Sequence, residues 1–323
     1  MAEAAGIELT LEGAGANPAP SSSFVWTQGK ANTLMASAVL AWGFAYVLMK
    51  LGVGVMGVLD LVAMRFSIAF VALVIVFWKR MRATDLKTLG LGAILGFFVF
   101  IACVALMYGV RFTTASAAAF FCSAAVVIVP ILQALLTRKA PSPAIIIGTV
   151  SAAVGIALLS FEGPTSIDAG AGFCLLGAFL YAVHVILIDR FTKHADALLL
   201  GIYQLGFAGA FGIIARLLIG TPTLPPSPIA WAAVLGLALL CSAFAFVAQV
   251  VAQAHTTPYH AAITLALEPV FAAMFAFILL SETLTGQDLA GAALVLFGVF
   301  VASGILNKFM TARHTKEAPD GHD

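Results

Sequence analysis

The chain has 323 residues, of which 62% are hydrophobic and 10% are charged, and its formal net charge at pH 7 is +1. A soluble domain is only about 45 to 50% apolar. The mean hydropathy of +1.07 therefore excludes an ordinary soluble protein and predicts an all-α, polytopic membrane protein.

A membrane-spanning helix needs about 20 mostly apolar residues. Apolar runs of about this length recur along the whole chain, and the connections between them are too short to form a soluble domain. We predict ten transmembrane helices, at residues 31–52, 57–78, 88–110, 113–136, 143–160, 170–188, 197–219, 229–254, 258–281 and 286–306.

Basic residues are distributed unevenly between the two sides of the predicted membrane. Twelve Lys and Arg residues share a side with the N-terminus, two lie on the other side, and Arg65 and Arg216 fall within spans. The positive-inside rule then predicts an inner-membrane protein with both termini in the cytoplasm. Residues 1–30 are too polar to bury, so we expect a disordered cytoplasmic tail there, and residues 307–323 form a cytoplasmic C-terminal tail. Arg216 is expected to snorkel outward.

The chain also resembles itself. When it is laid over itself at an offset of 139, Trp42 falls on Tyr181 and Arg65 falls on Gln204, and farther along the offset drifts to about 143. We interpret residues 31–160 and 170–306 as two five-helix repeats. An odd number of spans inserts the second repeat upside down, which is a transporter architecture. The alternative is that two halves rich in Leu, Ala and Gly look alike without being repeats.

Arg65 and Glu268 each lie inside a long apolar run. A charge within the bilayer costs at least about 2.5 to 3.5 kcal/mol, so such residues mark a functional site or a mutual pair. At 1.5 Å per residue, Arg65 lies about 12 Å below one face and Glu268 about 15 Å above the other. Both depths are close to the middle of the membrane, so a shared site and a structural salt bridge both remain open.

Other polar and aromatic residues fall near the same depth. Trp42 and Tyr181 lie near the centre, Tyr46 lies one turn from Trp42, and Gln204 occupies the position of Arg65 in the other repeat. His184 is either a cavity residue or an interhelical hydrogen-bonding group. The predicted substrate-binding residues are Trp42, Tyr46, Arg65, Tyr181, His184, Gln204 and Glu268.

Glu268 is also the candidate proton-coupling residue, because a carboxylate can change its protonation state. Pro269, beside it, removes a backbone donor in mid-span, and Pro130 does the same in the fourth span. We predict a helix kink at each of these prolines, or simple tolerance of proline in a membrane helix.

Several stretches resemble the EamA-type members of the drug/metabolite transporter superfamily. They are Ala41-Trp42-Gly43-Phe44-Ala45-Tyr46 with Lys50, Met64-Arg65-Phe66, Leu267-Glu268-Pro269-Val270, and Ser281-Glu282-Thr283-Leu284 with Gly291 and Gly298. The resemblance covers about residues 31–306. It implies ten helices in two inverted five-helix repeats, a central cavity, and movement of amino acids or other small metabolites, commonly outward. The first half departs from the pattern, since Arg138 stands opposite Glu282.

Other classes of function leave no trace in the sequence. The chain has no HExxH, GxSxG or P-loop motif, and its four cysteines occur singly within spans, as expected of packing residues. We expect no enzyme activity, no cofactor, no metal and no nucleic-acid partner. The expected partners are the lipid bilayer, a small-molecule metabolite and a proton, in a monomer or a homodimer. The prediction is an exporter that works by alternating access, and the alternative is a membrane enzyme or a scaffold that transports nothing.

Overall fold

The computed structural model describes residues 27–113, 115–160, 169–280 and 286–302, and within them every regular element is a helix. The elements are α1 (Gln28–Val53), α2 (Val58–Met81), α3 (Leu86–Phe112), α4 (Ala115–Cys122), α5 (Ala125–Thr137), α6 (Pro143–Ser160), α7 (Ala169–Phe191), α8 (Ala197–Ile219), α9 (Pro228–Ala238), the π-helical segment η1 (Leu239–Phe244), α10 (Ala245–Gln253), α11 (Pro258–Leu265), α12 (Glu268–Leu280) and α13 (Gly286–Ala302). Most of the two predicted tails and the motif at 281–284 lie outside the described residues.

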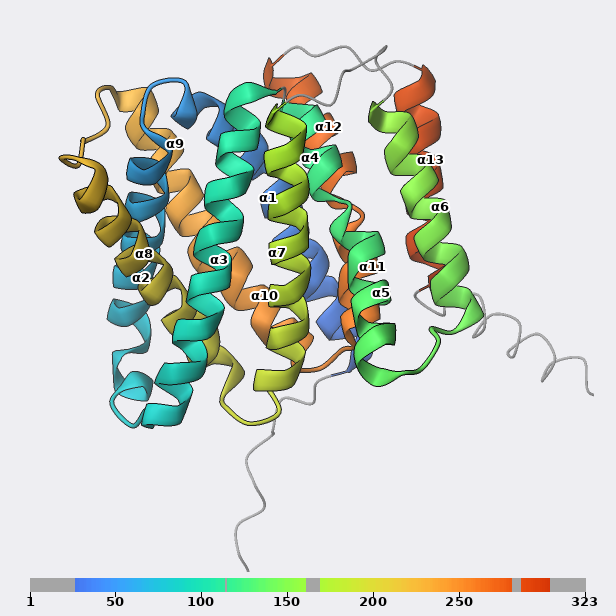
Figure 1. Ribbon diagram of the computed structural model, residues 1–323, viewed down its shortest axis with the longest axis horizontal. Helices are drawn as coiled ribbons and strands as arrows, with labels where there is room; N and C mark the ends of the chain where they lie inside the picture. Colours follow the sequence, from blue (N-terminus) through green and yellow to red (C-terminus); the bar gives the residue numbers. More distant parts are fainter. Residues whose placement is uncertain (1–26, 114, 161–168, 281–285, 303–323) are drawn as a thin grey trace, which may run out of the picture.

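These elements form the ten predicted membrane helices, shown in Figure 1 as a bundle of parallel and antiparallel rods. Seven helices are long and apolar enough to cross a bilayer, and α5, α6 and part of α13 are shorter apolar helices. Three of the ten are interrupted: α4 is followed by α5, α11 by α12, and α9 by η1 and α10. The prediction of ten helices is confirmed, but three of them are not continuous α-helices.

Polar side chains cap the beginnings of five helices. Thr27, Asp85, Asp196, Ser227 and Thr257 each accept a hydrogen bond from a backbone N–H in the first turn of α1, α3, α8, α9 and α11. A helix leaves its first N–H groups without backbone partners, so these side chains satisfy some of them. The caps also show why the spans begin where the apolar runs do.

The packing of the helices repeats when the two halves are exchanged. In this exchange α1 replaces α7, α2 replaces α8, α3 replaces α9 to α10, α4 and α5 replace α11 and α12, and α6 replaces α13. The contact of α3 with α7 corresponds to that of α10 with α1, and the contact of α5 with α7 to that of α12 with α1. The contacts of α2 with α8 and of α6 with α13 correspond to themselves. The fold therefore has the two inverted five-helix repeats that the sequence predicts.

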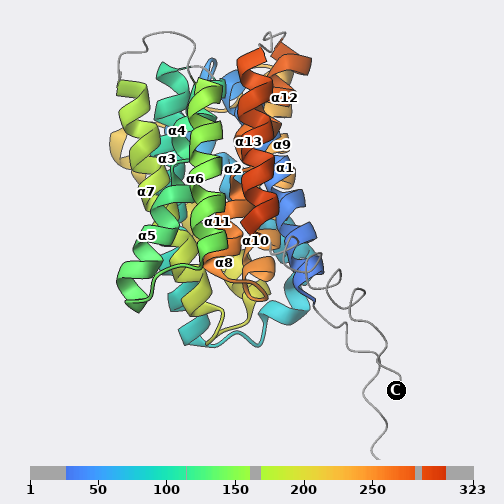
Figure 2. The same cartoon turned by 90° about the vertical axis from the view of Figure 1, so that its right-hand side faces the viewer.

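The contact between α6 and α13, which lies at the right-hand edge of the bundle in Figure 1 and faces the viewer in Figure 2, depends on glycine. A Cβ atom added to Gly155 would lie 2.5 Å from the carbonyl oxygen of Gly291, and one added to Gly298 would lie 2.5 Å from that of Gly148. These two contacts are equivalents under the repeat. Lipid supplies no hydrophobic drive between helices, so close backbone approach is one of the ways such a pair gains van der Waals contact.

Ion pairs join α2 to α8 at both ends. Asp60 accepts a hydrogen bond from Arg216 Nε at 2.8 Å, and Asp196 accepts one from Arg80 at 2.5 Å. Asp60 and Asp196 are 136 residues apart, as are Arg80 and Arg216, so the two ion pairs are arranged alike but do not fall on equivalent positions at the repeat offset of 139. The expectation that Arg216 snorkels outward is wrong, because the buried carboxylate of Asp60 holds its side chain against α2.

The two ion pairs differ in burial. The Asp60 side chain is 4% exposed and Arg216 is 18% exposed, whereas the exposed fractions of Asp196 and Arg80 are 36% and 57%. Thr223 adds its backbone N–H at 3.0 Å and its hydroxyl at 2.7 Å to Asp60. The Asp60 pair thus also fixes the segment that follows α8, and its loss leaves a buried charge.

We predict that Arg216→Ala lowers the free energy of unfolding by about 3 kcal/mol, because removing one partner of a buried pair strands the other charge. The matched control is Arg80→Ala, which breaks the exposed ion pair at the other end of the same two helices and should cost less than about 1 kcal/mol. Unfolding of both variants in the same detergent, followed by tryptophan fluorescence, gives the comparison. Equal losses of unfolding free energy in the two variants would contradict the explanation that burial determines how much an ion pair contributes to stability.

Candidate functional site

Two membrane helices are interrupted at equivalent points of the two halves. The first half has its break at Ser123 and Ala124, between α4 and α5, and the second half has it at Ala266 and Leu267, between α11 and α12. The later repeat offset relates the two breaks, since it places Cys122 on Leu265. Helices α5 and α11 are in contact, so the two breaks lie close to each other in the bundle.

The broken helices present the N-termini of α5 and α12, and Glu268 is the first residue of α12. A helix N-terminus carries a partial positive charge that favours a nearby carboxylate. Pro269 is the second residue of α12, where its missing N–H costs little because first-turn N–H groups have no helical partner. Pro130 lies inside α5, and the interruption precedes it at Ser123 and Ala124.

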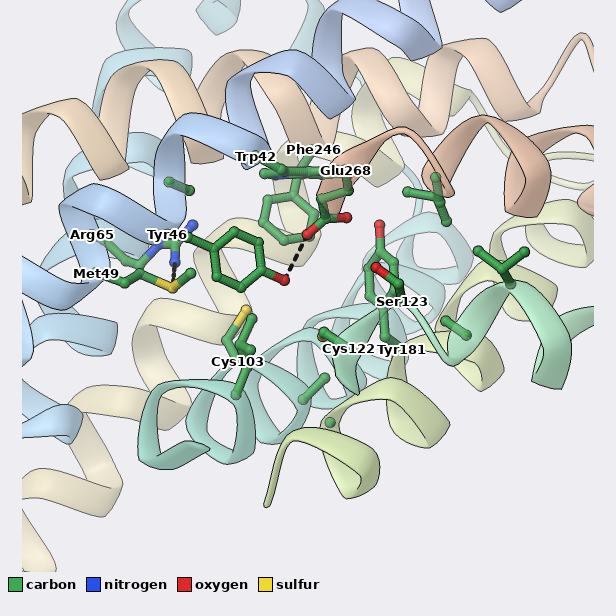
Figure 3. Close-up of a pocket in the computed structure, with 17 residues that line it drawn as sticks. Trp42, Tyr46, Met49, Arg65, Cys103, Cys122, Ser123, Tyr181, Phe246 and Glu268 are labelled. Carbon is green, nitrogen blue, oxygen red and sulfur yellow. Dashed lines mark hydrogen bonds between the residues drawn. The ribbon is translucent and has the colours of Figure 1, made fainter. Parts of the chain in front are cut away.

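A cavity of about 60 Å³ lies beside these breaks, and Figure 3 shows the side chains around it. A single water molecule needs roughly 10 to 15 Å³ of such space, so the cavity has room for several. Both halves contribute to its wall. The residues that line it are Trp42, Ala45, Tyr46, Met49, Arg65, Ala102, Cys103, Leu106, Cys122, Ser123, Ala125, Val126, Gly177, Tyr181, Phe246, Leu265 and Glu268.

The two charged residues of the cavity do not pair with each other. Tyr46 donates a hydrogen bond from its hydroxyl to Glu268 Oε1 at 2.8 Å. Arg65, which is 3% exposed, donates from Nε to Ser242 Oγ at 2.9 Å, and its guanidinium lies 4.9 Å from the centre of the Phe66 ring. None of the ion pairs among the described residues joins Arg65 to Glu268. The alternative of a structural salt bridge between them therefore does not describe this structure.

Aromatic rings form one wall of the cavity. The Trp42 ring packs edge-on against Tyr181, with centroids 6.0 Å apart, and against Phe246, with centroids 5.1 Å apart. Phe246 continues the wall to Phe66 at 5.9 Å. Offset and edge-on arrangements are the favourable geometries for such rings. The wall is thus a continuous apolar surface of packed rings, and Figure 3 shows Trp42 and Phe246 next to Glu268.

The π-helical segment η1 holds two of the cavity residues in place. Trp42 Nε1 donates to the carbonyl oxygen of Cys241 at 2.9 Å, and Ser242 accepts the hydrogen bond from Arg65. Single π-turns in helices often occur at functional sites because they change which backbone groups are free to bond. Sequence reasoning missed the roles of both Cys241 and Ser242. The drift of the repeat offset gives no signal of the π-turn, because it is already present where α3 and α9 begin, at Leu86 and Pro228, before η1.

His184 and Gln204 do not line the cavity. His184 Nε2 and Gln204 Oε1 are 2.8 Å apart and share a hydrogen bond, and both side chains are fully buried. The His184 ring stacks on Tyr181 with centroids 5.6 Å apart, so this pair lies directly behind a cavity residue. The structure thus brings Trp42, Tyr46, Arg65, Tyr181 and Glu268 together around the cavity and places the other two predicted residues in the layer behind it.

Comparison with known proteins identifies the family to which this chain belongs. The model of the EamA-like transporter family matches residues 29–161 and again residues 168–304. This chain belongs to the EamA-like transporter family. It is therefore a multi-pass membrane transporter and not an enzyme, and its two family matches correspond to the two halves of the fold.

Similar proteins agree with this assignment. Two uncharacterized transporters of Archaeoglobus fulgidus are 27% identical over 292 residues, covering 87% of this chain and 91% of the relative, and 25% identical over 290 residues, covering 85% and 97%. A protein of known crystal structure aligns with a TM-score of 0.70 at 15% identity, covering 88% of this chain and 99% of that chain. The last similarity shows the fold alone.

The geometry of the site depends on how closely α1 and α12 approach. A Cβ atom added to Gly43 would collide with the Phe271 Cβ and lie 2.9 Å from the Phe271 backbone carbon. We predict that Gly43→Ala lowers the free energy of unfolding by about 1 to 3 kcal/mol, because overpacking pushes α12 and Glu268 away from Tyr46. Thermal unfolding of the purified protein measures this change.

The matched control is Gly90→Ala in α3, where a Cβ atom would meet nothing within 4 Å. Alanine in an open helical position should stabilise by roughly 0.5 to 1 kcal/mol, because it restricts the unfolded chain. Opposite signs for the two substitutions are the expected result. A loss of the same size at both positions would mean that the close approach of α1 and α12 does not determine the effect.

Proposed function

We propose that this transporter carries small zwitterionic metabolites, foremost amino acids and their analogues, out of the cell across the inner membrane. One observation carries the proposal: a guanidinium and a carboxylate line the same small cavity without pairing with each other. The solute carboxylate would bind Arg65, and its ammonium group would bind Glu268. Both termini would lie in the cytoplasm, on the side where basic residues are concentrated.

The rest of the cavity wall supports the same class of solute. Trp42, Tyr181 and Phe246 offer apolar and aromatic surface for a side chain, and an aromatic face also attracts a cation. The N-termini of α5 and α12 favour an anionic group, as the half-helices of secondary transporters do. A small polar head with a compact apolar side chain meets all of these groups together.

The proposed mechanism is alternating access. Helices α5 and α12 each begin at a break beside the cavity, and the two inverted halves can exchange conformations about it. Movement of one half relative to the other would then open the cavity to the opposite side of the membrane. The glycine contacts of α6 with α13 provide smooth backbone surfaces for such a movement.

Binding of matched solutes tests the roles of the two charges. L-phenylalanine, phenethylamine and 3-phenylpropionate share one ring and differ in which charged group they carry. We predict that Arg65→Gln weakens 3-phenylpropionate about 10- to 100-fold and spares phenethylamine, and that Glu268→Gln does the reverse, because a charged hydrogen bond contributes roughly 1.5 to 3 kcal/mol. Both variants should weaken phenylalanine. Ligand-induced thermal stabilisation of the purified protein reports each affinity.

The control for this experiment is Lys193→Gln, which removes a surface charge whose side chain is 63% exposed and pairs with Asp189. It should leave all three affinities unchanged. Equal losses for the amine and the acid in both cavity variants would contradict the proposed division of labour between Arg65 and Glu268.

We also propose that Glu268 couples transport to protons, because the same carboxylate would bind the proton or the solute ammonium but not both. Glu268→Gln should abolish phenylalanine accumulation driven by a pH gradient in proteoliposomes, while exchange between equal concentrations persists at a reduced rate. The gradient and the exchange are measured on the same vesicles. Unchanged gradient-driven accumulation would remove Glu268 from the coupling mechanism.

A further inference from the structure

Four buried polar side chains lie behind the aromatic wall of the cavity, next to Tyr181, which belongs to that wall and has a buried hydroxyl. These five residues come from α7, α8 and α10, and we call them the polar cluster: Tyr181, His184, Gln204, Gln249 and Gln253. Among them His184, Gln204 and Gln249 are 0% exposed and Gln253 is 3% exposed. The only hydrogen bond found between side chains of these residues in the described structure joins His184 to Gln204.

Most of the polar atoms in this cluster have no partner among the described residues. They are the Tyr181 hydroxyl, His184 Nδ1, Gln204 Nε2, and both amide atoms of Gln249 and of Gln253. Gln249 lies beside the Tyr181 hydroxyl, although no hydrogen bond of normal geometry joins them. Such groups are almost always satisfied in folded proteins, by protein or by ordered water.

Energy decides between a dry and a wet cluster. Each buried polar atom without a partner costs roughly 1 to 3 kcal/mol, so the seven atoms named above would cost about 7 to 20 kcal/mol if the cluster were dry. The net stability of a folded protein is only about 5 to 15 kcal/mol. A dry cluster would therefore cost as much as the whole fold gains, and water is the small molecule able to satisfy donors and acceptors alike.

The cluster is continuous with the cavity at one end and reaches the end of a helix at the other. Tyr181 lines the cavity and stacks on His184. Gln249 and Gln253 are four residues apart, so they share one face of α10, and Gln253 is its last residue. The line of polar groups thus leads from the cavity toward the turn at residues 254–257.

The other half of the protein is apolar at three of the five equivalent positions. At the repeat offset of 143, Gln249 corresponds to Leu106 and Gln253 to Val110, and at the offset of 139 His184 corresponds to Ala45, whereas Gln204 and Tyr181 correspond to Arg65 and Trp42. Leu106 and Ala45 line the cavity, and Val110 is fully buried. The inner ends of the two halves therefore differ in polarity.

We infer that α7, α8 and α10 hold the closed form of a polar passage, which admits water when these helices separate and then connects the central cavity with the turn at residues 254–257. Uncharged amides line it, so it offers hydrogen bonds to water and to the polar head of a solute without holding either tightly. This inference rests on the proposed function in that it names the route by which a polar solute reaches the cavity, on the side proposed to be cytoplasmic.

Cysteine labelling tests the passage without any solute. Gln253→Cys and Val110→Cys place thiols at two repeat-related positions near helix ends, both buried in the native protein. The full-length protein in detergent is treated with charged 2-sulfonatoethyl methanethiosulfonate, and peptide mass spectrometry separates the introduced thiol from the four natural ones. We expect labelling at position 253 to be at least tenfold faster than at position 110. Equal rates, or faster labelling at position 110, would overturn the proposal.

A second variant examines the same inference through stability. Gln249→Leu replaces an amide that has no partner among the described residues by an apolar group of similar size, so the thermal midpoint should stay the same or rise. A fall of several degrees would show that the amide bonds directly to a neighbouring helix, and the passage would then be wrong.

These two measurements separate this inference from the proposed function. Labelling and unfolding need no solute, so they fail only if the passage is absent. The affinities of phenylalanine and its two analogues for the Arg65 and Glu268 variants depend on the cavity alone, and they would stand or fall independently.

Discussion

The bilayer cannot hydrogen-bond to a protein, and the rest of this structure depends on that constraint. An interrupted helix leaves backbone groups that only protein or enclosed water can satisfy. Here the interruptions at 123–124, 239–244 and 266–267 all adjoin the interior of the bundle, beside one cavity. Within η1, the carbonyl oxygen of Cys241 accepts a hydrogen bond from Trp42 Nε1. Irregular backbone and functional side chains therefore occur together because the same enclosed space makes both tolerable.

The separation of Arg65 from Glu268 follows from a balance of similar energies. Two buried charges recover their desolvation cost only if their mutual geometry is very good. In this structure each has a neutral partner instead, Ser242 for Arg65 and Tyr46 for Glu268. Neutral partners hold the side chains in position without cancelling their charges. A cavity with uncancelled charges gains the most from a solute that carries both opposite charges, and this is the physical basis for proposing a zwitterion.

Much of the fold follows from the sequence because it depends on patterns that extend over many residues. Apolar runs of about 20 residues give the spans, and the match of Trp42 to Tyr181 and of Arg65 to Gln204 gives the repeat. The depths predicted within the membrane also agree with the position of the cavity, since five residues predicted near mid-membrane line it: Trp42, Tyr46, Arg65, Tyr181 and Glu268. Depth depends only on the rise per residue, which varies little from one helix to another.

Other features could not be predicted, since they depend on how each helix is rotated. His184 and Gln204 have suitable depths but face each other behind the cavity wall. Ser242 lies at the site because the π-turn directs it toward Arg65. A single inserted residue does not change the composition of the segment enough to be recognised. The pair of Asp60 and Arg216 joins two helices that are far apart in the chain, and no local pattern connects them. The repeat does not reveal it either, because Asp60 falls on Leu199 at the repeat offset of 139.

The two halves are similar in the arrangement of their helices and different in the side chains that line the cavity. The proposed transport mechanism uses both properties. The helix breaks and the glycine contacts obey the repeat, as the proposed mechanism requires if each half is to adopt the shape of the other. Glu268 instead corresponds to Ala125. A perfectly symmetric cavity would carry the same charge twice and repel itself. In the proposed mechanism, placing the carboxylate in one half and the guanidinium in the other would keep the exchange of shapes while giving the solute two unlike groups to bind.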